Sequence, residues 1–270
     1  MSTYKDVDWI LVLGCNNSGT TLIDNILRRH PDIDCLPREG QFCCKKIYPT
    51  AVDGGVGRVW TQKPNEYVWD ETTEYDAKDL LEHWFSIRMK GGERRFMMEK
   101  SPPHATKSRW FQKYIHEKTG KYPYFICVVR NGYAVAEGTI RRCREERGET
   151  RTYAETATHW SEVNRILLED MKHLKKSVLF KYEDIGKNYN DFRQVLGDFL
   201  GLDPLSFPEK RHIVMRFNHR HALTIGIKNF NRAQIDKMSI DDIRTVNEHA
   251  GPMLKQLGYY RDAREKEEEV

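Results

Sequence analysis

Apolar and polar positions follow two spacings that alternate along the chain. Short, largely apolar runs typical of strands in a parallel sheet lie at 9–13, 95–100, 122–130 and 177–181. Segments with apolar residues at helical spacing lie at 20–29, 77–89, 104–118, 133–146, 152–174, 191–200 and 239–257. This order predicts an α/β protein with a central parallel sheet between two layers of helices, a three-layer α/β/α fold.

Two stretches show neither spacing. Residues 48–75 combine turn-forming Gly, Pro, Asn and Asp with several large aromatics, which predicts either a lid or acceptor wall or packing against the domain edge. Residues 203–231 look irregular and basic, and their histidines lack the spacing of metal ligands. With 270 residues and 39% apolar composition, we expect one domain over 1–262 and a disordered acidic tail at 263–270.

The charge balance narrows the choice of partners. A net charge of +4, from 44 basic and 40 acidic residues, suits an anionic small molecule better than a nucleic acid. No apolar run approaches the roughly 20 residues of a membrane span, and the N-terminus lacks a signal-peptide core, so a cytoplasmic protein is expected. The six cysteines form no C-x-x-C pair, which argues against a disulfide framework or a zinc site. The sequence is also compatible with a homodimer.

The turn after the first strand carries the most specific pattern. Residues 14–21, GCNNSGTT, have the G-x-x-x-x-G frame of a phosphate-binding P-loop, whose backbone N–H groups and following helix would face one anion. Thr20 stands where ATP- and GTP-binding loops carry a lysine, so amides and hydroxyls favour a group such as a 5′-phosphosulfate. The alternative is the glycine turn of any strand-to-helix connection.

An arginine ends the strongest strand pattern. Arg130 stands where a Walker B strand would place a Mg²⁺-binding aspartate, which indicates direct pairing with a phosphate. Arg142 lies twelve residues further on, within reach of the same point if a helix starts after the turn. Its basic neighbours, Arg141 among them, are typical of a solvated helix face.

Two further side chains are candidates for the chemistry. Glu39 lies on a loop that would return toward the tip of the sheet, where a carboxylate could accept a proton from a hydroxyl. Lys100 ends a strand, where parallel sheets bind ligands and where an ammonium could neutralise a transferring group. The alternatives are a solvated glutamate and a lysine paired with Glu99 or with water.

Several short motifs follow one another in an order that resembles a known family. They are SGTT, HPDI to EGQF, EKSPPHA, VVRNGYAV followed by Arg142, LFKYEDI and LGYY. In content and order they resemble the markers of sulfotransferases that use 3′-phosphoadenosine 5′-phosphosulfate (PAPS), over residues 9–260. The style is similar to the bacterial and Golgi-type branch, which includes tyrosylprotein and carbohydrate sulfotransferases. The resemblance implies a P-loop-containing fold.

The resemblance also implies which residues bind the cosubstrate. The 5′-phosphosulfate would lie on the turn and helix start, at Asn16, Asn17, Ser18, Gly19, Thr20 and Thr21. Arg130 and Arg142 would bind the 3′-phosphate, and Tyr182 would lie near the adenine or ribose. Lys228 would belong to a late loop that closes over the cosubstrate.

The catalytic pair is implied in the same way, and two positions depart from the family pattern. Glu39 matches the general base of the tyrosylprotein branch, and Lys100 matches a lysine that stabilises the transferring group. Asn17 stands where the family usually has an arginine or lysine. Gly138 stands where a serine usually joins the arginine on the 3′-phosphate, and Thr139 could substitute for it.

The implied activity is in-line transfer of a sulfuryl group from PAPS to an acceptor hydroxyl or amine, without a required metal. A P-loop kinase or NTPase is one alternative, against which Thr20 and Arg130 count. A catalytically silent nucleotide-binding protein of the same fold is another, which Asn17 and Gly138 keep open. The acceptor is not specified: a sugar, a tyrosine, a lipid and a small alcohol all fit.

Overall fold

The computed structural model describes residues 3–43, 55–217 and 222–262. Its centre is a parallel sheet in the order β2-β3-β1-β4-β5. The strands are β1 (Asp8–Leu13), β2 (Ile33–Cys35), β3 (Phe96–Lys100), β4 (Tyr124–Val129) and β5 (Ser177–Lys181). Because every neighbouring pair is parallel, the carboxyl ends of all these strands lie at one edge of the sheet.

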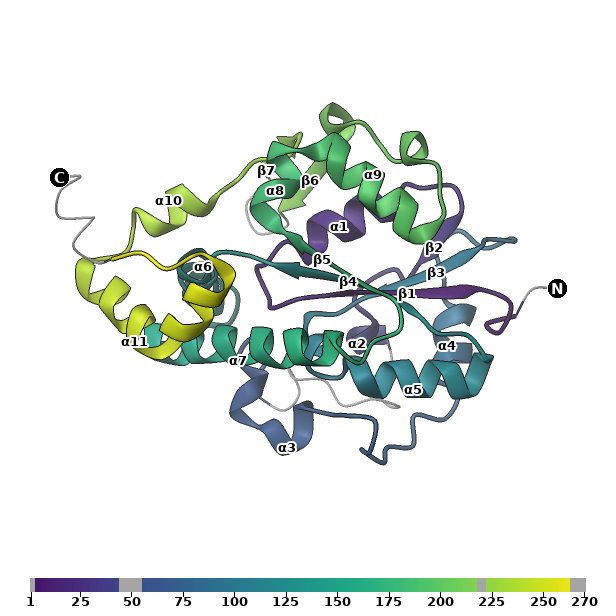
Figure 1. Cartoon of the computed structure of the whole chain (residues 1–270), viewed down its shortest axis with the longest axis horizontal. Helices are drawn as coiled ribbons and strands as arrows, with labels where there is room; N and C mark the ends of the chain where they lie inside the picture. The colour runs from purple at the N-terminus through teal and green to yellow at the C-terminus, as the bar shows by residue number, and fades with distance from the viewer. Residues whose placement is uncertain (1–2, 44–54, 218–221, 263–270) are drawn as a thin grey trace.

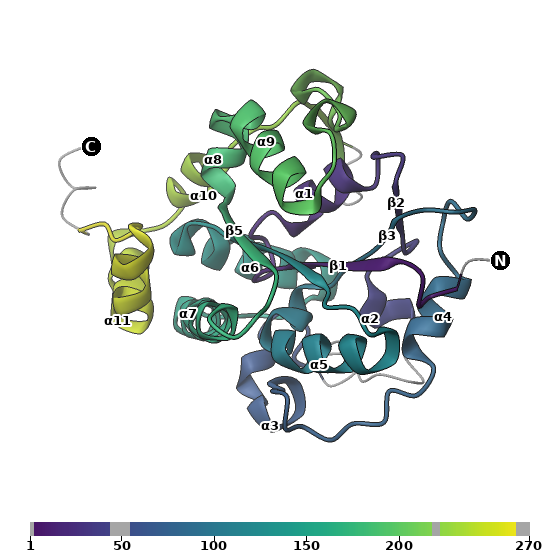
Figure 2. The same cartoon turned by 45° about the vertical axis from the view of Figure 1, so that its right-hand side comes forward.

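Helices cover both faces of the sheet, as Figures 1 and 2 show. One face carries α1 (Thr20–Leu27), α8 (Tyr182–Lys187) and α9 (Tyr189–Leu200). The other carries α4 (Leu80–Ser86), α5 (Ser108–Thr119) and α7 (Tyr153–Met171), with α6 (Gly132–Arg147) and α11 (Ile240–Leu257) packed against α7. The α/β/α fold predicted from the sequence is therefore confirmed.

The side chains of β1 divide the apolar core into two parts. Trp9 and Leu11 belong to the cluster that includes α7, whereas Ile10 and Val12 belong to the cluster that includes α1 and α9. Each of these side chains is almost completely buried. Successive residues of a strand point to opposite faces, so an uninterrupted apolar run is required where both faces are covered.

Short elements complete the described chain. The short helices are α2 (Gly40–Cys43), α3 (Pro64–Tyr67) and α10 (Asn231–Ile235). The 3-10 turns are η1 (Trp60–Gln62), η2 (Pro102–Thr106), η3 (Pro204–Ser206) and η4 (Lys210–His212). Strand β6 (Val214–Phe217) pairs with β7 (Ala222–Ile225) as an antiparallel hairpin. The stretch 203–231, expected to be irregular, is thus partly ordered. Strand β2 is not among the strands predicted from the sequence, because its three residues are too few for a periodic signal.

Residues 48–75 include part of the apolar core. Trp60 and Tyr67 are buried, and Trp69 packs edge-on against Trp110. The part of this segment after residue 55 therefore packs in the domain, one of the two alternatives predicted. Residues 48–54, Cys44 and the acidic tail lie outside the described residues.

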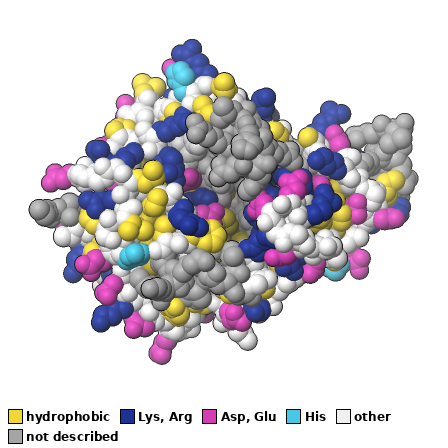
Figure 3. All heavy atoms as spheres, turned by 180° about the vertical axis from the view of Figure 1, so that it is seen from behind, with side chains coloured by type: hydrophobic (Ala, Val, Ile, Leu, Met, Phe, Trp, Pro, Cys, Tyr) yellow, Lys and Arg dark blue, Asp and Glu magenta, His cyan; other side chains and the backbone are white. Residues whose placement is uncertain are grey.

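The surface of the described chain mixes charges of both signs. Lys and Arg are interspersed with Asp and Glu over the face drawn in Figure 3. Within the described ranges, no helix combines the length and the apolar character required to cross a membrane. The cysteines described there, at 15, 35, 43, 127 and 143, are free thiols.

Candidate active site

Four neighbouring strands deliver residues to one edge of the sheet. Lys100 ends β3, the P-loop turn follows β1, Arg130 follows β4, and Tyr182 follows β5. These elements surround a pocket of about 390 Å³, which Glu39 also lines. The crevice beyond the carboxyl ends of parallel strands is where α/β proteins bind ligands.

The P-loop turn is closely packed on its neighbours. A Cβ on Gly14 would lie 2.5 Å from the Val128 carbonyl oxygen. Gly19 has a φ of 104°, and a Cβ there would lie 2.6 Å from the Tyr182 ring. Only glycine fits these two positions, because a side chain would displace the strand or the tyrosine.

Two buried polar groups in the turn lack hydrogen-bond partners among the described residues. They are the Ser18 hydroxyl and the Asn16 side-chain oxygen. No side chain caps the N-terminus of α1, which begins at Thr20. Backbone N–H groups and a helix N-terminus in this arrangement favour an anion.

Arg130 is a buried cation held by neutral groups. Its Nε donates to Asn231 Oδ1 (2.7 Å), Nη1 to the Asn17 carbonyl (2.7 Å) and Nη2 to Gln234 Oε1 (2.9 Å). The guanidinium also lies over the Tyr182 ring, 4.3 Å from its centroid. Burial lowers its pKa, and among the described residues no carboxylate forms an ion pair with it. Such a charge favours a bound anion.

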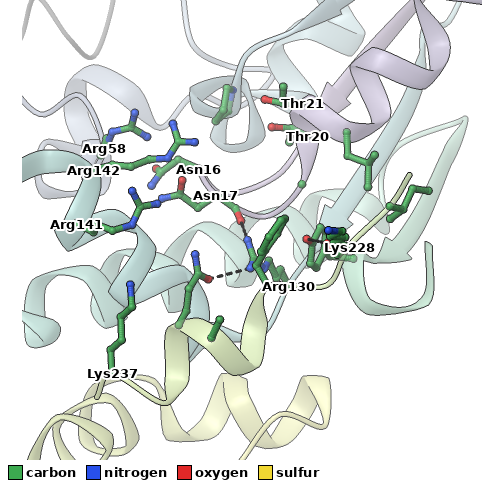
Figure 4. Close-up of a pocket in the computed structure, with 18 of the residues that line it drawn as sticks. Asn16, Asn17, Thr20, Thr21, Arg58, Arg130, Arg141, Arg142, Lys228 and Lys237 are labelled. Atoms are coloured by element: carbon green, nitrogen blue, oxygen red, sulfur yellow. Dashed lines mark hydrogen bonds between the residues drawn. The ribbon is translucent and has the colours of Figure 1, made fainter. Parts of the chain in front are cut away.

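Further cations line the same pocket. Together with Arg130 they are Arg58, Arg141, Arg142, Lys228 and Lys237. Figure 4 shows Arg58, Arg141 and Arg142 gathered on one side of Asn16 and Asn17. Among the lining residues only Glu39 is acidic, so the described pocket carries a strong excess of positive charge.

Two glutamates on α6 hold part of this cluster. Glu146 pairs with Arg58 (2.5 Å) and with Arg142 (3.1 Å), and Glu145 pairs with Arg141 (2.6 Å). Burial, and then repulsion from Arg58, lowers the pKa of Arg142. Arg142 thus lies beside other cations at the pocket, where a polyanion would relieve the repulsion.

The pocket-lining carboxylate of Glu39 contacts an ammonium that is not itself among the lining residues. Lys100 Nζ lies 2.7 Å from Glu39 Oε1, and Gln41 Nε2 donates to Glu39 Oε2 (2.6 Å). Glu39 is therefore not a freely solvated glutamate, and Lys100 pairs with Glu39, not with Glu99 as the alternative interpretation had it. The Lys100 side chain is only 10% exposed.

The loop that carries Glu39 is anchored by the buried carboxylate of Glu99. Glu99 Oε1 accepts hydrogen bonds from the Gly40 N–H (3.0 Å) and from the Ser101 hydroxyl, and Oε2 lies 2.9 Å from His104 Nδ1. The Gln41 N–H in turn donates to the Ser101 hydroxyl oxygen (3.1 Å). These bonds fix the backbone beside Glu39.

Most of the chain matches one known protein family. The model of the sulfotransferase family matches residues 9–206. The chain belongs to the sulfotransferase family. Among curated protein sequences, no significant match was found.

Solved sulfotransferases share the P-loop-containing fold. A sulfotransferase domain from the curacin biosynthetic pathway is 19% identical, covers 94% of this chain and 98% of its own, and has a TM-score of 0.50. The sulfotransferase domain of the Synechococcus PCC 7002 olefin synthase is 16% identical over 91% and 95%, with a TM-score of 0.51. A sulfotransferase from Mycobacterium avium is 9% identical over 93% and 77%, with a TM-score of 0.53.

The site of this sulfotransferase suits the PAPS-type cosubstrate that the family implies. Such a molecule carries two separate anionic groups. The pocket offers the P-loop turn for one, and for the other Arg130, which forms no ion pair with a carboxylate among the described residues. Ser18 is fully buried within this turn and, like Gly138, does not line the pocket. Arg130 donates to the Asn17 carbonyl, so a direct hydrogen bond joins this arginine to the P-loop turn.

Most cosubstrate positions implied by the resemblance meet at this pocket. Asn16, Asn17, Gly19, Thr20, Thr21, Arg130, Arg142, Tyr182 and Lys228 all line it. The Tyr182 hydroxyl donates to the Lys228 carbonyl (2.8 Å), which ties the late loop to α8. The Thr139 hydroxyl oxygen accepts hydrogen bonds from the side chains of Asn16 (3.0 Å) and Asn17 (2.9 Å).

Some lining residues escaped sequence reasoning. Arg58 follows a glycine-rich stretch without periodicity, and Arg141 was read as part of a solvated face. Gln234 and Lys237 lie on and just beyond α10, a helix of five residues. Lys237 lies beyond the basic stretch 203–231 to which the sequence pointed.

Proposed function

We propose that the enzyme transfers a sulfuryl group from PAPS to an acceptor hydroxyl, with Glu39 as general base. The observation that carries this proposal is the pairing of two features in one pocket. The buried guanidinium of Arg130, which has only neutral hydrogen-bond partners, lines this pocket, and so does Glu39, which pairs with Lys100. An anionic sulfuryl donor and an acceptor hydroxyl can therefore be bound side by side in this pocket.

Binding falls to the residues around the P-loop turn. The N–H groups at the start of α1 and the Ser18 hydroxyl would hold the 5′-phosphosulfate, and Arg130 with Arg142 would hold the 3′-phosphate. Tyr182 would contribute its ring near the nucleoside, where it already lies beside Gly19 and Arg130. Because Thr20 replaces the P-loop lysine, the charge on the donor is met by amides and arginines.

Glu39 would remove the acceptor proton. When bound, PAPS supplies the sulfuryl group: the acceptor oxygen forms a bond to sulfur as the bond from sulfur to the 5′-phosphate oxygen breaks, and its electron pair leaves with adenosine 3′,5′-bisphosphate. The proton passes to the Glu39 carboxylate, which Gln41 and Lys100 orient. As Glu39 becomes neutral, the Lys100 ammonium loses an ionic partner and can stabilise charge on the leaving oxygen.

Two variants and one matched control test the proposal. Glu39→Gln keeps the size of the side chain, so the enzyme should retain its affinity for adenosine 3′,5′-bisphosphate. Turnover of labelled PAPS on a panel of acceptors should fall about 10²- to 10⁴-fold, the range for loss of a general base. Glu82→Gln, at an exposed position on α4, should change neither quantity.

Arg130→Ala should act on binding. Loss of a charge-assisted contact costs about 1.5 to 3 kcal/mol, so the dissociation constant for the bisphosphate should rise roughly ten- to a hundredfold. Wild-type turnover in Glu39→Gln would remove Glu39 from the role of base. Preference of the wild type for ATP with Mg²⁺ over the bisphosphate would favour the kinase alternative, and bisphosphate binding without transfer to any acceptor would favour a silent protein.

A further inference from the structure

The short helix α10 supplies two of the three acceptors for Arg130. Asn231 and Gln234 are three residues apart and therefore share a helix face, from which both accept hydrogen bonds from the guanidinium. The Asn231 amide also donates to Glu183 Oε1 (2.6 Å), which ties α10 to α8. The helix thus borders the place expected to bind the 3′-phosphate.

Gln234 fills the space beside Gly138. A Cβ built on Gly138 would lie 3.2 Å from Gln234 Nε2 and 3.7 Å from its Cδ. The Cβ of the family's usual serine would therefore be in tight contact with the glutamine amide. A serine at this position and a glutamine at 234 compete for one place.

The Gln234 amide nitrogen is directed by its own hydrogen bond. Because Oε1 accepts from Arg130 Nη2 (2.9 Å), the same carboxamide presents its Nε2 hydrogens elsewhere, on the side of Gly138. Among the described residues no acceptor is hydrogen-bonded to this nitrogen, and Gln234 lines the pocket. An amide in this setting can donate to an anion beside Arg130.

Thr139 is not positioned to take over this role. Its hydroxyl oxygen accepts from both Asn16 and Asn17, so the side chain is turned to the P-loop turn. In contrast, Gln234 contacts Arg130 directly. The donor closest to the position of the missing serine is thus the glutamine.

We infer that Gln234 replaces that serine and donates through Nε2 to the 3′-phosphate of the cosubstrate. The inference rests on the proposed function, which places PAPS in this pocket. It assigns the recognition of a 3′-phosphorylated nucleotide to α10 together with Arg130. Gln234 is therefore a specificity-determining residue, because it contacts the group that distinguishes PAPS from other adenine nucleotides.

Titration with two nucleotides tests the inference. Adenosine 3′,5′-bisphosphate carries the 3′-phosphate and adenosine 5′-phosphate lacks it. Wild type should prefer the bisphosphate; if it does not, the proposed function itself fails. In Gln234→Ala, affinity for the bisphosphate should fall about ten- to a hundredfold, as for a hydrogen bond to a charged group, with little change for adenosine 5′-phosphate. An unchanged preference in this variant would overturn the inference alone.

The companion variants separate donation to phosphate from mere orientation of Arg130. Gly138→Ser should not improve bisphosphate binding in the wild-type background, because the amide already occupies the space. In Gln234→Ala the same change should restore most of the lost affinity, since a hydroxyl donor returns to the site. Gly138→Ala in that background adds the Cβ without the hydroxyl and should restore nothing. Absence of rescue by serine, or equal rescue by alanine, would refute donation by Gln234, and melting temperatures would verify that all variants are folded.

Discussion

We predict that the buried side chain of Glu99 supports both the stability of the fold and the position of the loop that carries Glu39. Glu99 is fully buried and receives hydrogen bonds from Gly40 and Ser101 while contacting His104. Glu99→Ala removes the common partner of all three groups. Because Gly40 directly follows Glu39, the loop that holds the base should loosen together with the local core.

The size of the effect follows from the number of contacts removed. Each buried hydrogen bond to a charged group contributes about 1.5 to 3 kcal/mol, and such contacts are not additive. Leaving a buried polar group without its partner costs about 1 to 3 kcal/mol, so the loss for these three groups together is about 3 to 5 kcal/mol. At roughly 2 to 4 °C for each kcal/mol in a large domain, the melting temperature should fall by about 6 to 20 °C.

Thermal unfolding and amide hydrogen exchange measure the two consequences separately. Circular dichroism gives the melting temperature, and exchange over residues 36–43 reports whether the Gly40 and Gln41 N–H groups lose protection. Glu82→Ala, on the exposed side of α4, is the control and should change stability by no more than about 0.5 kcal/mol. If Glu99→Ala were as stable and as well protected as this control, Glu99 would not anchor the loop.

Two further predictions concern pH and the P-loop turn. Burial raises the pKa of Asp170 to about 6, although the Ser108 hydroxyl donates a hydrogen bond to its carboxylate. Between about pH 4 and about pH 6 the folded state therefore holds a proton that the unfolded state releases. The free energy of unfolding should fall as the pH rises from about 4 to about 6, by up to about 3 kcal/mol. Asp170→Asn should flatten this part of the profile in denaturant titrations; an unchanged slope would contradict it. Gly19→Ala should displace Tyr182 and weaken adenosine 3′,5′-bisphosphate about tenfold or more, roughly 1.4 kcal/mol. Gly55 also has a positive φ, but a Cβ there would meet no atom of the described residues within 4 Å. Equal losses in Gly19→Ala and Gly55→Ala would therefore argue against the contact with Tyr182.

Local patterns were enough to predict the framework of the fold. Strands β1 and β4 have both faces covered, so burial requires an unbroken apolar run that is visible in the sequence. The turn after β1 was equally readable, because its glycines meet backbone and ring atoms so closely that no other residue fits. The same logic placed Lys100 and Arg130 at strand ends, which a parallel sheet brings to one edge.

Elements set by long-range contacts could not be predicted in this way. Strand β2 has three residues and α10 has five, too few for a periodic signal, and their conformations depend on their neighbours. Arg58 lines the pocket and pairs there with Glu146 on α6. These partners are 88 residues apart in the sequence, so no local pattern indicates that they are in contact.

The two departures from the family pattern are connected in the structure. Asn17 has a φ of 64°, a conformation that asparagine tolerates better than most residues, and from there its amide contacts Thr139 and its carbonyl accepts from Arg130. Arg130 in turn contacts Gln234, whose amide fills the space that Gly138 leaves. One continuous set of hydrogen bonds therefore joins the position without the usual cation to the position without the usual hydroxyl. A lysine or arginine at position 17 would lose the hydrogen bond to Thr139, and a side chain at position 138 would crowd Gln234. Asn17 and Gly138 therefore both fit the contacts that Thr139 and Gln234 make in this chain.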